Sequence, residues 1–75
     1  MKDLLLYIAR SLVEHPDQVT VTEVENGDEL TLELRVAPED MGKVIGKQGR
    51  IAKAIRSVVK AASSKDHIKV DVEIV

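Results

Sequence analysis

The stretch best suited to do chemistry is Gly46-Lys47-Gln48-Gly49, which follows two apolar residues and precedes a helix-like sequence. Glycine adopts backbone angles that other residues resist, and it lets another backbone come close. Two glycines three residues apart, just before a helix, therefore predict a tight turn with backbone N–H groups around one open space. Such a turn suits a chain of phosphates, and Lys47 places a cation in it.

A purely structural explanation of the two glycines stands beside this one. In that explanation Gly46 only ends one helix, and Gly49 only eases entry into the next. The four-residue pattern alone does not separate the two explanations, so the surrounding charge has to be considered.

The basic residues are concentrated around this turn, although the chain has a formal net charge of −2. Residues 41–65 hold seven of the eleven lysines and arginines and none of the thirteen acidic residues. The window is therefore +7 and the rest of the chain −9. A local basic region of this kind is the electrostatic footprint of a nucleic-acid site. Its members are Lys43, Lys47, Arg50, Lys53, Arg56, Lys60 and Lys65.

Catalysis and metal binding have little support in the sequence. The chain has no cysteine, and His15 and His67 lie far apart without the spacing of metal ligands on a helix. The acidic residues fall mostly on expected turns and exposed strand positions, where they keep a small domain soluble. A phosphate-binding loop of the nucleotide-hydrolase kind is excluded, because its spacing and its lysine-hydroxyl pair are missing. We expect no enzymatic activity, no cofactor and no small-molecule substrate.

The sequence also predicts the surroundings of the protein. No stretch approaches the roughly 20 apolar residues that a membrane span needs. The first residues lack the long apolar segment and the small-residue site of a cleavable signal. We therefore expect a single domain over residues 1–75 that is cytoplasmic and does not act at a membrane.

An amphipathic helix is predicted over residues 2–14. Leu5, Ile8, Ala9 and Leu12 follow the i, i+3, i+4, i+7 spacing of an apolar stripe. Pro16 ends this helix, because the residue before proline avoids the α region. The only aromatic residue, Tyr7, is expected to wedge the helix against the sheet.

Three strands are predicted, over residues 18–25, 29–36 and 67–74. In the first, the apolar alternation slips between Val21 and Val24, which indicates a β-bulge or an early fraying of the strand. Asn26-Gly27 then gives a strong hairpin signal. The other two strands alternate regularly, and each shows one apolar face.

Two helices, over residues 39–45 and 50–63, are expected to flank the glycine turn. At ~100° per residue, the second places its basic side chains within roughly 120° of one another, opposite its apolar half. The element order is α-β-β-α-α-β. The crossover between residues 37 and 66 is long enough to make the last two strands parallel. We expect an α+β fold, a three-stranded mixed sheet covered on one face by three helices.

The segment Val44-Ile45-Gly46-Lys47-Gln48-Gly49, between a short helix and a longer one, resembles the signature of the KH domain. The G-x-x-G loop of that domain clamps about four single-stranded nucleotides. The element order resembles the type II, bacterial arrangement over the whole chain. The chain is also similar to the small bacterial RNA-binding proteins of the KhpA type.

This resemblance implies single-stranded RNA binding in the cytoplasm and a role as an RNA chaperone. It implies a partner, either a second KH-domain protein of the KhpB (Jag-like) type or a second copy in a homodimer. It also implies a link to cell-length control, cell shape and peptidoglycan homeostasis in cell wall biogenesis. The predicted RNA-binding residues are Lys43, Val44, Ile45, Gly46, Lys47, Gln48, Gly49, Arg50, Lys53 and Arg56.

Two features predict that RNA binding has little sequence preference. Many KH domains carry a larger aliphatic residue where this chain has Ala52, so the groove floor is expected to be shallow. No aromatic residue lies near the loop to stack on a base. An alternative hypothesis is a protein–protein module that dimerises through the same G-x-x-G surface.

Overall fold

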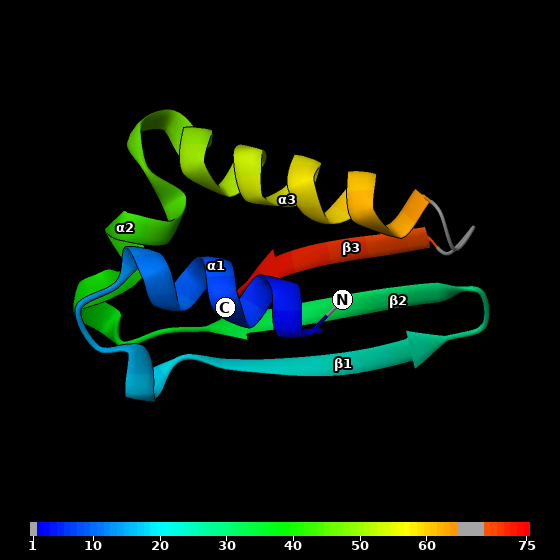
Figure 1. The fold of residues 1–75 in the computed structure, drawn as a ribbon, viewed down its shortest axis with the longest axis horizontal. Helices are drawn as coiled ribbons and strands as arrows, with labels where there is room; N and C mark the ends of the chain where they lie inside the picture. Colours follow the sequence, from blue (N-terminus) through cyan, green and yellow to red (C-terminus); the bar gives the residue numbers. More distant parts are fainter. Residues whose placement is uncertain (1, 65–68) are drawn as a thin grey trace.

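The computed structural model describes residues 2–64 and 69–75, and the predicted element order is confirmed (Figure 1). Short 3-10 turns connect some of the elements. The helices and strands, in chain order, are α1 (Lys2–Leu12), β1 (Thr20–Asn26), β2 (Glu29–Arg35), α2 (Met41–Ile45), α3 (Arg50–Ser63) and β3 (Lys69–Ile74). Lys65, His67 and the predicted start of the last strand lie outside the described residues.

The sheet is mixed, with β2 in the centre. β1 pairs with β2 antiparallel, and β3 pairs with β2 in parallel, as the long crossover predicted. The predicted bulge or early fraying in the first strand is wrong. Pairing advances one residue at a time from Thr20 opposite Arg35 to Asn26 opposite Glu29. Val24 points to the face of the sheet that the helices leave uncovered, and it is 43% exposed there. The slip in the pattern therefore reflects an apolar residue on the outer face of a regular strand, not an irregularity of the backbone.

The helices cover one face of the sheet, and the core lies between the two layers (Figure 1). β2 contributes the most, because alternate residues of a central strand point into the core. Burying a Leu or Val side chain contributes about 1.5–3 kcal/mol, so this layer holds the small domain together. The core consists of Leu5, Ala9, Val19, Val21, Leu30, Leu32, Leu34, Val44, Ile55, Val59, Val70 and Val72.

Helix α1 departs from its prediction in two ways. It ends at Leu12, two residues early. Tyr7 does not wedge the helix against the sheet; its side chain is 72% exposed. The reason is geometric: at ~100° per residue, Tyr7 lies about 200° away from both Leu5 and Ala9, the two buried residues of the helix.

Candidate nucleic-acid interface

Gly46 ends helix α2 and turns the chain toward the loop. Its φ of 74° lies in the region that favours glycine, and its N–H donates to the carbonyl oxygen of Gly42 at 2.9 Å. A Cβ at this position would lie 2.6 Å from Cγ1 of Ile51, the second residue of α3. The fold itself therefore requires glycine here, which supports the structural explanation for this one residue.

The remainder of the loop is open. Gly49 also has a φ of 74°, but a Cβ there would meet no atom within 4 Å. Between the glycines, Gln48 holds a left-handed backbone with a φ of 56° and a ψ of 25°. A non-glycine residue in this region is uncommon and carries a local backbone cost. The side chains of Lys47 and Gln48 are both exposed at the tip.

Helix α3 carries the predicted basic strip on its solvent side. Arg50, Lys53 and Lys60 are exposed, while Ile55 and Val59 of the same helix are buried. The amphipathic pattern is thus confirmed, although Ala54 and Val58 of the apolar half are exposed too. Within residues 2–64 and 69–75, no ion pair involves Lys47, Arg50 or Lys53.

Arg56 is oriented differently from the other cations of α3. Its Nε donates to the carbonyl oxygen of Val72 in β3 at 3.1 Å. β3 is an edge strand, in which the outward-facing carbonyl oxygens have no partner within the sheet, and the guanidinium of Arg56 covers that of Val72. Arg56 therefore lies over the seam between α3 and the sheet edge, and its other N–H groups remain as donors.

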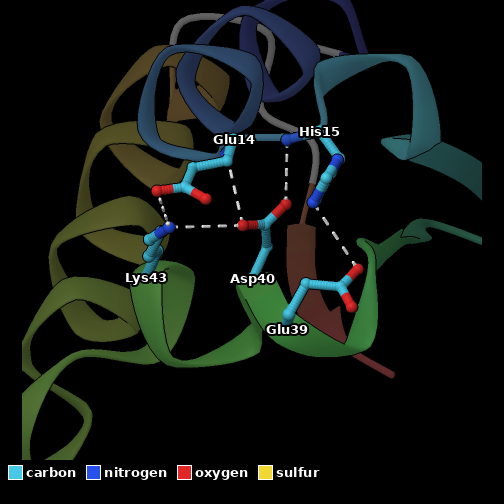
Figure 2. Close-up of polar contacts among 5 residues, drawn as sticks. All are labelled: Glu14, His15, Glu39, Asp40 and Lys43. Atoms are coloured by element: carbon cyan, nitrogen blue, oxygen red, sulfur yellow. Dashed lines mark hydrogen bonds and ion pairs between the residues drawn. The ribbon is translucent and has the colours of Figure 1, made fainter.

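Lys43 points away from the loop tip, toward the end of α1 (Figure 2). Its Nζ lies 2.9 Å from Oε1 of Glu14 and 3.5 Å from Oδ1 of Asp40. The hydrogen bond to Glu14, together with the negative charges of Glu14 and Asp40, raises the pKa of Lys43 above its ordinary value, although partial desolvation opposes this. The cation is therefore held within the protein by two carboxylates.

Asp40 is fully buried at the start of α2, and sequence reasoning missed it. Its carboxylate accepts the backbone N–H groups of Glu14 at 3.2 Å and of His15 at 3.0 Å. Burial raises the pKa of Asp40, but these two hydrogen bonds and the electrostatic influence of His15 and Lys43 outweigh it, so the pKa is lowered. The only sequence signal was an acid at a helix start; its partners lie 25 and 26 residues away.

The apolar residues predicted for the site divide between the core and its edge. Val44 is fully buried, and Ala52 is almost so. Ile45 and Ile51 are half-buried and pack against the core. Val44 therefore supports the loop from below, while Ile45 and Ile51 retain some exposed surface beside it.

An apolar groove that the sequence did not predict runs between α1 and α3. It is open and has a volume of about 510 Å³. Tyr7, which was expected to wedge α1 against the sheet, and Val58, on the apolar half of α3, are both exposed here. Arg50 belongs both to this groove and to the start of α3 beside the loop. The lining residues are Leu4, Tyr7, Ile8, Leu12, Arg50, Ile51, Ala54, Ile55 and Val58.

Among residues 2–64 and 69–75, no three His, Cys, Asp or Glu side chains are grouped as a metal site requires. No helix in these ranges has the length and apolar character to cross a membrane.

The topology and the G-x-x-G loop between α2 and α3 together define a type II KH fold. The chain belongs to the KH-domain family of KhpA and KhpB, whose model matches residues 2–74. The resemblance read from the sequence is thereby confirmed.

Relatives and a solved structure agree with this assignment. The chain is 64% identical to RNA-binding protein KhpA of Clostridium acetobutylicum and 63% identical to that of Clostridium perfringens, over the full length of each. The identity to RNA-binding protein KhpA of Chlamydia muridarum is 45%, over 99% of this chain and 95% of that protein. These names describe RNA binding and no catalysis. A crystal structure of Aquifex aeolicus Era matches 97% of this chain with a TM-score of 0.67 and 21% identity. The chain spans 28% of that structure's chain, and the likeness concerns the fold alone.

Proposed function

We propose that this protein binds single-stranded RNA through the G-x-x-G loop and the basic side of α3. The observation that carries the proposal is the open loop itself: Lys47 and Gln48 project from it, and Gln48 holds a left-handed backbone. Strain of this kind persists where the surrounding structure imposes it and is concentrated at binding sites. The naming of the relatives as RNA-binding proteins supports the same function.

The contacts divide into two kinds. Lys47, Arg50 and Lys53 hold phosphates, because they are exposed and without ion pairs in the described ranges. Such contacts position a strand without reading its sequence, and they make the affinity strongly salt-dependent. Gly49, which has open space around it, lets the sugar-phosphate backbone come close. Bases then lie over the seam between α3 and β3, where Arg56 is placed.

The finer biological role follows from the resemblance. The protein acts as an RNA chaperone in the cytoplasm and works with a second KH-domain protein of the KhpB (Jag-like) type or as a homodimer. A single clamp of about four nucleotides binds weakly, and a second KH unit raises the affinity through effective concentration. The role in cell-length control and peptidoglycan homeostasis is part of this proposal.

A second candidate function, a protein–protein module, is favoured by the groove between α1 and α3. Contiguous exposed apolar side chains are a feature of interaction sites, and Tyr7 and Val58 are exposed on this groove. The sequence placed the dimer interface on the G-x-x-G surface; the groove lies beside that surface and shares Arg50 with it. The two functions therefore occupy adjoining surfaces.

An NMR titration of the labelled protein with a short single-stranded RNA, at two salt concentrations, tests the first function. We expect chemical-shift changes confined to residues 43–56 and to β3, weaker at the higher salt. The double change Lys47→Asp and Gln48→Asp is expected to remove these chemical-shift changes, while the spectrum of the free variant remains that of a folded protein. Unchanged binding by this variant contradicts the assignment of the clamp. No shifts at either salt, with a dimer mass in light scattering, favours the second function.

A further inference from the structure

We propose that the ion pair of Asp40 and Lys43 positions the G-x-x-G loop, and that Lys43 holds α2 in place from behind the loop and does not contact phosphate. The part of this inference that concerns RNA rests on the proposed function. It revises the prediction for Lys43, which sequence reasoning grouped with the phosphate contacts because of its charge and its place before the loop.

The first step is the way in which α2 is held. This helix has only five residues, too few for its own hydrogen bonds to fix its orientation. Val44 anchors its middle in the core, and Asp40 anchors its start to the end of α1 through the N–H groups of Glu14 and His15. A single anchor at Val44 leaves the helix free to pivot, whereas two anchors fix its direction.

The second step is the distance over which the anchor acts. The loop begins directly after Ile45, so Asp40 and Gly46 lie at opposite ends of α2, about 9 Å apart along the helix axis. A small rotation at Asp40 therefore displaces the loop. At the far end, Gly46 packs on the side chain of Ile51 with no room for a Cβ, so the displacement is passed on to the start of α3.

The third step is the charge of Asp40. A buried carboxylate needs hydrogen bonds and a counter-charge, because breaking such a pair leaves an uncompensated charge in the interior. Lys43 is the described cation within 4 Å of this carboxylate, and Glu14 holds its ammonium on the outer side (Figure 2). Moving Lys43 to an RNA phosphate would take this counter-charge away from Asp40.

The loop itself gives the first test, without RNA. We expect Lys43→Gln and Asp40→Asn each to shift the backbone amide signals of Gly46 and Gly49 in the NMR spectrum of the free protein. The matched control is Lys69→Gln, which removes one positive charge from an exposed ion pair with Glu29 on the sheet and should leave these signals in place. Because Lys43 is partly exposed, Lys43→Gln should fold and test the position of the loop even if Asp40→Asn does not fold. Wild-type loop signals in Lys43→Gln overturn the proposal.

The second test separates a positioning role from a phosphate contact. Binding to an oligouridine of about eight nucleotides is measured from about 50 to about 200 mM KCl, a range over which the affinity of a protein that contacts phosphates falls steeply. Lys47→Gln should lower the slope of log affinity against log salt by about 0.7, the value for one contact to a single strand. Lys43→Gln should weaken binding about 3- to 10-fold at every salt concentration, with the slope unchanged.

Each result of the salt series has a defined meaning. A slope reduced as in Lys47→Gln makes Lys43 a phosphate contact and overturns the proposal. An unchanged affinity with only a lower melting temperature reduces the pair to a merely structural role and also overturns it. If the wild-type protein binds the oligouridine at no salt concentration, the proposed function fails, and the loop amide signals still decide whether the pair positions the loop.

Discussion

Gly46 and Ile51 are in contact so close that no side chain fits between them: a Cβ on Gly46 would lie 2.6 Å from Cγ1 of Ile51. This contact joins the end of α2 to the first turn of α3 across the G-x-x-G loop. The positive φ of Gly46 adds a second reason for glycine.

Gly46→Ala is therefore expected to destabilise the protein by roughly 2–5 kcal/mol, because the strain of a φ of 74° with a ψ of 177° adds to the overpacking against Ile51. Gly49→Ala is the comparison, because Gly49 has the same φ but a ψ of 16°, in the milder left-handed region, and open space around it; it should cost only about 1–2 kcal/mol. Chemical denaturation measures both. Adding Ile51→Ala to Gly46→Ala should recover the steric part in a double-mutant cycle. Equal effects in the two single variants, with no coupling to Ile51, would show that the contact is unimportant.

The hydrogen bond from Arg56 to Val72 is expected to hold α3 against the edge of the sheet. Arg56→Met keeps most of the aliphatic stem but removes the donor, so the free energy of unfolding should fall by about 0.5–1.5 kcal/mol. Lys53→Met, one turn earlier on the exposed side of α3, is the control and should change it by less than about 0.5 kcal/mol. Urea denaturation gives both values. A loss no larger than in Lys53→Met would mean that the bond does not stabilise the seam.

Asp40 should make the stability of the protein depend on pH in the acid range. Its pKa is lowered in the folded state, so its contribution is present above the ordinary pKa of an aspartate, near 4, and is lost as pH falls through the folded value. We expect the stability difference between wild type and Asp40→Asn to be largest near neutral pH and to shrink below about pH 4. Denaturant midpoints across this range measure it.

Four charged or titratable groups lie around the Asp40 carboxylate, so a control has to show that the acid dependence comes from Asp40 itself. His15→Gln, which removes one of the other titratable groups, is this control. The four groups are Glu14, His15, Glu39 and Lys43. The acid dependence should persist in His15→Gln and be reduced in Asp40→Asn. A difference between wild type and Asp40→Asn that stays constant down to about pH 2.5 would show that the Asp40 charge is not the source.

The apolar groove between α1 and α3 predicts self-association or partner binding. Val58→Asp places a charge on this surface, where Val58 is 48% exposed, so it should abolish any dimer while leaving the fold intact. Val24→Asp, on the open face of the sheet, is the control with the same change of residue and similar exposure. Light scattering over a concentration series measures the mass. A dimer that survives Val58→Asp but not Val24→Asp would place the interface on the sheet.

The G-x-x-G loop shows which features of the candidate site could be predicted from local sequence. The glycine spacing and the basic period of α3 are properties of neighbouring residues, so the turn, its exposed tip and the strip of cations were predictable. Strand pairing was predictable for a similar reason: the crossover length decides that β2 and β3 are parallel.

Lys43 and Tyr7 show where local sequence was insufficient. Lys43 has the charge and the place of a phosphate contact. Asp40 lies only three residues before it, but only the folded chain buries Asp40 and brings Glu14 to the Lys43 ammonium. Tyr7 is a large aromatic residue of the kind found in cores, but Leu5 and Ala9 occupy the buried side of the same helix. Helical and strand periods are determined by the sequence because they depend on residues a few positions apart. The partners of a buried charge and the final exposure of a side chain depend on elements that meet only in the tertiary structure.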